Sequence, residues 1–175
     1  MLVQIQPKPD LFGIPLPSDE RFFLIIIVIH IFLSLSAVVC GLVAMLKNKN
    51  SKGHPKFGTI YYWSIISAFV TVIVLSIMKW PHNNHLMVIG VLTVISVSIG
   101  RRMARLKVLR WARLHTICMG SSYVLLLTGF YVDNGKNLPL WNQFPQWFFW
   151  IFPAIVGAPI IIYVLKKHAL NRDRS

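Results

Sequence analysis

Long apolar runs alternate with short polar segments along the chain, and five of these runs are candidates for membrane spans. A helix needs about 20 mostly apolar residues to cross the hydrocarbon core of a bilayer. The runs are Phe22–Leu46, Gly58–Met78, Leu86–Gly100, His115–Val132 and Trp147–Leu165. The third and fourth are short, but flanking helix can lengthen both because residues 101–113 contain no Pro or Gly. The pattern predicts an all-α, polytopic membrane helical bundle of five transmembrane helices, a single domain over residues 22–165.

The polar segments on one side of this alternation hold most of the basic residues. Fourteen of the 18 Lys and Arg residues lie between runs one and two, between runs three and four, or after run five. The other side has only Lys8, Arg21, Lys79 and Lys136. The positive-inside rule then makes residues 1–21 an extracytoplasmic tail and residues 166–175 a basic cytoplasmic tail. We predict a multi-pass protein of the cell (inner) membrane, with its N-terminus outside and its C-terminus in the cytoplasm.

Composition supports the membrane assignment and excludes other classes of protein. Hydrophobic residues make up 55% of the 175 residues and charged residues 13%, whereas soluble domains carry roughly 25% charged residues. The net charge of +13 does not indicate nucleic-acid binding, because long apolar runs separate the basic residues. Both cysteines, Cys40 and Cys118, fall inside apolar runs, so we expect no structural disulfide.

The basic segment Arg101–Arg113 has two interpretations. Met103, Leu106 and Leu109 recur in it at helical spacing among arginines, which is typical of an interfacial helix that touches anionic lipid headgroups. The alternative is a solvated anchor that serves only the positive-inside rule. Both interpretations make the lipid bilayer the expected partner of the cytoplasmic loops.

Small and polar residues recur on one face of the apolar runs. In lipid, helices associate through such residues because burial of apolar surface drives little association. The residues are His30, Ser34, Ala37 and Gly41 in run one, Ser64, Ser67, Thr71 and Ser76 in run two, Gly90, Thr93, Ser96 and Gly100 in run three, and His115, Met119, Ser122 and Tyr123 in run four. These faces predict packing seams inside the bundle or, as the alternative, the lining of a substrate path.

The histidines are the residues with the most chemistry to offer. An ionisable group inside a membrane helix is a functional hypothesis by default, and we expect His30 to face the bundle as a neutral ring bonded to a hydroxyl or carbonyl group. His54 and His115 share one level, at the cytoplasmic boundary. They form the one histidine pair that could hold a b-type haem, since His30 lies in the outer half of its run.

Motifs for catalysis are missing from the sequence. It contains no Gly-x-Ser-x-Gly, His-Glu-x-x-His or phosphate-binding glycine loop. The apolar runs carry no Asp or Glu, whereas a proton-coupled transporter usually has one. We therefore predict no catalytic residues and no metal site, and a protein without enzymatic activity.

Two stretches resemble a known family. The first holds His30, Gly41-Leu42-Val43-Ala44 and the segment Lys52-Gly53-His54-Pro55-Lys56-Phe57-Gly58-Thr59-Ile60-Tyr61. The second is His115-Thr-Ile-Cys-Met119-Gly-Ser-Ser122-Tyr123 with Thr128-Gly129-Phe130. Together they resemble a bacterial family of multi-pass membrane proteins known as domain of unknown function 2306, except that His54 here directly follows the glycine of its loop. The resemblance implies a multi-pass bacterial membrane protein, supplies no activity, and draws attention to His30, His54, His115 and Tyr123.

Three functions compete on these observations. The first is a non-enzymatic accessory or small-ligand-binding membrane protein, with no cofactor. The second is a b-type haem or quinone-linked redox protein that uses His54 and His115. The third is a small transporter, which would need to oligomerise because five helices enclose little volume. Apart from these hypotheses, we expect a ligand or interhelical polar site at His30, Met119, Ser122 and Tyr123. A homo-oligomer or a membrane partner protein is compatible with all three, and nucleic acid is not an expected partner.

Overall fold

A computed structural model describes residues 10–11, 14–15, 21–49, 51–81, 83–107 and 109–172. Five long helices fill most of this range: α1 (Arg21–Leu46), α2 (Gly53–Met78), α3 (Asn84–Leu106), α4 (Trp111–Asn134) and α5 (Gln146–Arg172). All five are long and apolar enough to cross a membrane, since a 23-residue helix already extends about 35 Å. The chain is therefore a multi-pass membrane protein with a helical-bundle fold, as the apolar runs predicted.

Two short features complete the described structure. A pair of two-residue strands, β1 (Asp10–Leu11) and β2 (Ile14–Pro15), lies antiparallel before α1. The rest of the predicted tail, up to residue 20, lies outside the described residues. A 3₁₀ turn, η1 (Gly135–Asn137), follows α4 where Asp-Asn-Gly signals a turn. At the other end α5 continues to Arg172, so the basic segment after residue 165 begins as helix.

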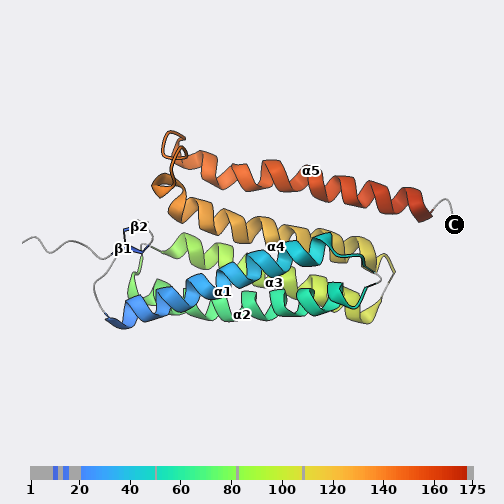
Figure 1. The fold of residues 1–175 in the computed structure, drawn as a ribbon, viewed down its shortest axis with the longest axis horizontal. Helices are drawn as coiled ribbons and strands as arrows, with labels where there is room; N and C mark the ends of the chain where they lie inside the picture. Colours follow the sequence, from blue (N-terminus) through green and yellow to red (C-terminus); the bar gives the residue numbers. More distant parts are fainter. Residues whose placement is uncertain are drawn as a thin grey trace, which may run out of the picture.

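The helices pack as neighbouring antiparallel pairs (Figure 1). Helix α1 lies along α2, and α3 lies along α4; α2 also packs on α3, and α4 on α1. Helix α5 packs mainly on α4 and lies at the outer edge of the bundle. The functional residues considered below therefore belong to a four-helix unit with α5 attached to one side.

The core of this unit is built from small side chains and a few aromatic ones. Ala37, Tyr61, Ile65 and Val97 form its centre. Eight of the sixteen residues on the predicted inward faces are buried, and seven others are half-buried. The buried ones are Ala37, Gly41, Ser64, Thr71, Ser76, Thr93, Gly100 and Ser122. Ser67 is an exception, because it is exposed. Large apolar side chains such as Phe32, Val88 and Ile155 point outward, as expected for a surface that contacts lipid.

A break in the helix divides the basic segment Arg101–Arg113, for which the sequence left an interfacial helix and a solvated anchor open. Helix α3 ends at Leu106, and α4 begins at Trp111. Lys107 and Arg110 between them adopt positive φ values of 48° and 61°, a left-handed conformation that stops a helix. The Lys107 N–H bonds the Met103 carbonyl at 3.0 Å and caps α3. The connection between α3 and α4 is thus short: Arg101, Arg102 and Arg105 belong to α3, and Arg113 belongs to α4.

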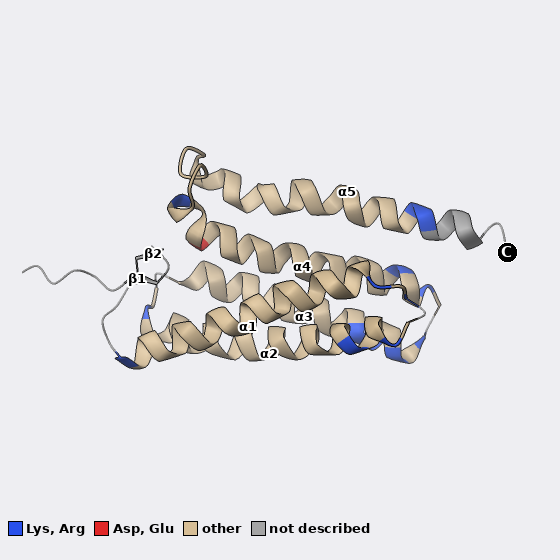
Figure 2. Ribbon diagram, in the orientation of Figure 1, with Lys and Arg blue, Asp and Glu red and all other residues tan. Residues whose placement is uncertain are grey.

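Charge is concentrated at one end of the bundle (Figure 2). The α1–α2 connection, the α3–α4 connection and the basic part of α5 all lie at this end. We call it the basic end. The opposite end holds the beginning of α1 and the ends of α2 and α4, and with them Arg21, Lys79, Asp133 and Lys136. The uneven charge distribution inferred from the sequence is thus present in three dimensions.

Candidate functional site

Two histidines meet at the basic end. His54 lies in the first turn of α2, and His115 lies near the beginning of α4. Their ring centroids are 6.2 Å apart, and the ring planes are inclined by 74°. Residues 47–52 and 107–110 are short connections, so the ends of four helices are held together here. The two histidines that the sequence placed at one level are therefore neighbours in space.

Backbone carbonyl groups fix the orientation of both rings. His54 Nδ1 lies 2.8 Å from the Ala44 carbonyl oxygen, and His115 Nδ1 lies 2.9 Å from the Gly100 carbonyl oxygen. A carbonyl oxygen only accepts hydrogen bonds, so each Nδ1 carries a hydrogen and donates it. In its neutral form each ring then has a lone pair on Nε2, available to a ligand.

The surroundings of the pair are basic and aromatic. Trp111 stands 6.4 Å from His115 between ring centroids. Lys49 lies in the connection that leads from α1 to α2, and burial lowers the pKa of its ammonium group. Across the described residues, no three His, Cys, Asp or Glu side chains cluster as a metal site would require. The pair can thus supply two nitrogen ligands but no carboxylate or thiolate.

Met119, Ser122 and Tyr123 lie further along α4 than His115, away from the basic end, and take part in packing between helices. Ser122 is fully buried and donates to the Met119 carbonyl at 2.8 Å. Tyr61 of α2 donates its hydroxyl hydrogen to Ser122 Oγ at 2.8 Å, because the hydrogen on Ser122 is already engaged. Tyr123 donates to the Val38 carbonyl of α1 at 3.1 Å. These bonds tie α1, α2 and α4 together directly beneath the pair.

Sequence reasoning assigned no role to Tyr61, although it is almost fully buried and central to this junction. Its position four residues before Ile65 on one helical face is the signal that could have found it. Gly41 makes the junction possible. A Cβ there would lie 2.8 Å from Tyr123 Cε2 and 2.9 Å from Tyr61 Cδ2, so only glycine lets α1 approach these rings.

His30 is separate from the pair. It lies 14 residues before Ala44 on α1, hence about 21 Å along the helix. Thr71 Oγ1 donates to the Ala68 carbonyl at 2.6 Å, so His30 Nδ1 donates to Thr71 Oγ1 at 2.8 Å. Ser34 Oγ donates to His30 Nε2 at 3.3 Å. His30 is thus a neutral ring with both nitrogens bonded inside the bundle, and it does not share a site with His54 and His115.

We expect His30→Leu to fold and insert at least as well as the unchanged protein. Leucine lowers the cost of placing α1 in the membrane, and hydrogen bonds between membrane helices average only about 0.6 kcal/mol. Thr71 keeps its own bond to Ala68 in this variant. The measurements are the yield of monodisperse protein and the melting temperature in mild detergent, with Phe32→Leu on the exposed face as control. Loss of folded protein in His30→Leu alone would show that the bond to Thr71 is structurally required.

A scan against protein-family models, a search of curated proteins and a search of solved structures each found no match to this chain.

Proposed function

We propose that this protein is a non-enzymatic integral membrane protein of the cell (inner) membrane that binds a small ligand between His54 and His115. The observation that carries the proposal is the orientation of the two rings. Histidines that bind metals almost always donate their second ring N–H to a carbonyl, carboxylate or water. Both histidines here donate Nδ1–H to a backbone carbonyl, so the free Nε2 atoms are already held in the form that a ligand needs.

The chemistry of the pair narrows the ligand class. Two Nε2 lone pairs attract an electron-pair acceptor or a hydrogen-bond donor. A quinone oxygen accepts hydrogen bonds and therefore does not suit two neutral rings in this tautomer. A bare zinc ion usually takes four protein ligands in a structural site and three in a catalytic one, and the described residues offer only these two.

A b-type haem is the candidate that we propose within this class. Porphyrin supplies four ligands to its iron, so the protein needs to supply only two. The ring centroids of His54 and His115 are 6.2 Å apart, and these two residues would hold the haem iron.

Titration with hemin tests this assignment. Protein purified in mild detergent should bind one hemin, with the shifted Soret band and the sharp α band on reduction that mark two axial histidines. We expect His54→Ala and His115→Ala each to remove these bands, because either change leaves one axial position empty. His85→Ala is the matched control, since His85 lies at the opposite end of the bundle beside Trp150.

The possible outcomes distinguish an error about the haem from an error about the binding site. Unchanged spectra in both alanine variants would rule out haem ligation by this pair. If Cu²⁺ and Zn²⁺ then also bound with equal affinity to the unchanged protein and to the double variant, the whole site would be wrong. Metal binding lost in the double variant, without a haem spectrum, would keep the site and replace the haem with a metal ion.

Orientation in the membrane is the second part of the proposal. We infer that the basic end faces the cytoplasm, so that the N-terminus is outside and α5 ends inside. The support is the division of the Lys and Arg residues, fourteen of 18 on one side of the alternation, together with the basic residues that the α1–α2 connection, the α3–α4 connection and α5 place at one end. Membership of the family known as domain of unknown function 2306, which two stretches of the sequence resemble, stays a prediction.

Reporter fusions check the orientation. Two reporters are fused after Ser175, one that is active only in the cytoplasm and one that is active only in the periplasm. We expect the first to be active and the second to be inactive, because basic loops resist translocation. The control is the same pair of reporters fused after Asn137, at the opposite end of α4, where the activities should be exchanged. A C-terminal fusion that is active only in the periplasm would reverse the orientation.

A further inference from the structure

A cleft opens between α2 and α3 at the basic end. Its volume is about 340 Å³. Aromatic side chains from α2 form one side, and one hydroxyl and three guanidinium groups from α3 form the other. The lining residues are Tyr62, Trp63, Ser98, Arg101, Arg102 and Arg105. The cleft thus combines three positive charges with a hydroxyl and two aromatic rings at the end of the apolar spans.

These arginines have no acidic partner in the described part of the chain. Of the five Asp and Glu residues in the sequence, Asp133 is the one whose side chain the structure describes, and it lies at the opposite end. Arg101 is half-buried and stacks over the Tyr62 ring, 4.4 Å from its centroid. Among the described residues the Tyr62 ring is the partner of this partly buried cation, and an anion from another molecule would supply the counter-charge that stabilises it.

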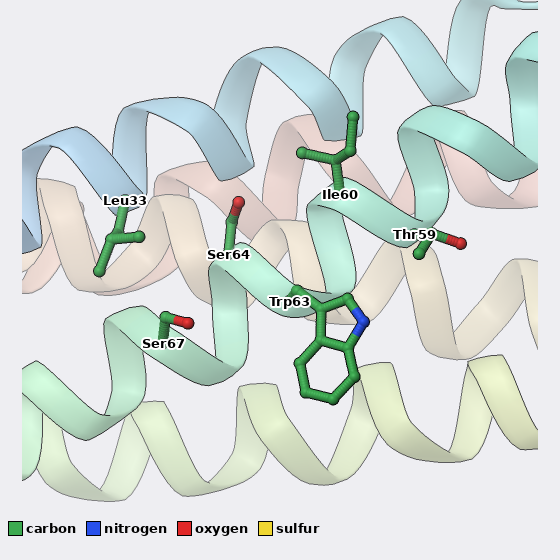
Figure 3. Close-up of a pocket in the computed structure, with 6 residues that line it drawn as sticks. All are labelled: Leu33, Thr59, Ile60, Trp63, Ser64 and Ser67. Atoms are coloured by element: carbon green, nitrogen blue, oxygen red, sulfur yellow. The ribbon is translucent and has the colours of Figure 1, made fainter.

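An apolar groove adjoins the arginine cleft. It lies between α1 and α2, has a volume of about 320 Å³ and is lined by Leu33, Thr59, Ile60, Trp63, Ser64 and Ser67. Figure 3 shows Leu33 on α1 beside the row of side chains on α2. Trp63, which is 57% exposed, borders both the groove and the cleft. Ser67, which the sequence placed on an inward face of its helix, is exposed and lines this groove instead.

We propose that the cleft and the groove together bind one anionic glycerophospholipid. Its phosphate group lies among Arg101, Arg102 and Arg105, and one acyl chain runs along the apolar groove past Trp63. Guanidinium groups bind phosphate through paired, charge-assisted hydrogen bonds, and basic side chains at the ends of membrane helices attract anionic lipid. A tryptophan between a polar and an apolar region sits where such rings collect at membrane interfaces.

A lipid fits better than a soluble phosphate because the cleft borders surfaces that face the bilayer. Val91, Leu92, Ile95 and Ile99 project outward from α3 in the turns that lead to the arginines. A molecule that reaches the arginines from this side comes from the membrane and brings its own apolar chains. The proposed orientation would assign this lipid to the cytoplasmic leaflet, but the binding itself does not depend on that orientation.

The test compares two variants with the same change in charge. Delipidated protein in mild detergent is titrated with dioleoyl phosphatidylglycerol and, separately, with dioleoyl phosphatidylcholine, and bound lipid is counted by native mass spectrometry. We expect Arg101→Gln/Arg105→Gln to weaken phosphatidylglycerol binding about 25-fold, roughly fivefold per arginine. Arg110→Gln/Arg113→Gln removes two exposed arginines outside the cleft and should weaken it less than twofold.

A second variant tests the apolar groove and does not depend on the first one folding. Ser67→Trp fills the deep end of the groove, and we expect it to weaken binding of the dioleoyl lipid but not of its dihexanoyl analogue. Equal losses in the two arginine pairs would overturn the proposal, because nonspecific surface charge would then explain the affinity. Competition by inorganic phosphate as strong as that of the lipid would also overturn it, as would equal affinity for phosphatidylcholine.

Discussion

Replacing Gly41 with leucine should lower the free energy of unfolding by about 3 kcal/mol, at the upper end of typical overpacking costs. Even a Cβ at this position would contact the Tyr61 and Tyr123 rings within 3 Å. The rings cannot easily move aside, since hydrogen bonds hold them to Ser122 and to the Val38 carbonyl. The leucine must therefore push α1 away from α2 and α4. Reversible denaturation in mixed detergent micelles measures the loss.

The same substitution should also disturb the histidine pair. Ala44, whose carbonyl orients His54, lies one turn beyond Gly41 on α1. Gly58→Leu is the matched control, because a Cβ at Gly58 meets nothing within 4 Å. Leucine is also a better helix former than glycine by roughly 0.8 kcal/mol, so the control should be neutral or stabilising. Equal destabilisation by both changes would show that Gly41 is not a special point of close approach.

The number and type of the helices could be predicted from the sequence because the bilayer restricts the choice. A backbone in lipid must satisfy its own hydrogen bonds, so an apolar run of sufficient length has to be helix. The exact ends were less predictable. Lys107 follows the end of α3 and Arg110 precedes the start of α4, both in left-handed conformations. Neither is Gly or Asn, the residues that usually adopt this conformation at the end of a helix. For that reason the sequence left open whether the basic segment is an interfacial helix or a solvated anchor.

The candidate site was only partly predictable, for a geometric reason. Counting residues from the ends of the runs gives the depth of a side chain in the membrane, and this placed His54 and His115 at one level. It does not give the rotation of a helix about its axis. The carbonyl groups that orient the two rings and the bond from Tyr61 to Ser122 depend on that rotation. The arginine cleft depends in addition on which helices are neighbours.

Replacing Gly157 with leucine should detach α5 from α4 and leave the other four helices in place. Two glycines hold this interface close: a Cβ at Gly157 would collide with Val124 of α4, and a Cβ at Gly120 would lie 2.7 Å from Ile161 of α5. Helix α5 packs mainly on α4, so the strain is relieved when α5 moves outward. Overpacking costs of roughly 1–3 kcal/mol should raise amide exchange in α5 by about tenfold or more.

Hydrogen exchange followed by mass spectrometry separates α5 from the rest of the bundle. Ala158→Leu is the control, because Ala158 is the next residue along the helix and is exposed; its leucine should meet only lipid or detergent. Exchange in α1–α4 and ligand binding by His54 and His115 should stay unchanged in both variants, since the pair is built from the ends of the first four helices. If Gly157→Leu instead raised exchange throughout α1–α4, α5 would be an integral part of the unit that carries the site.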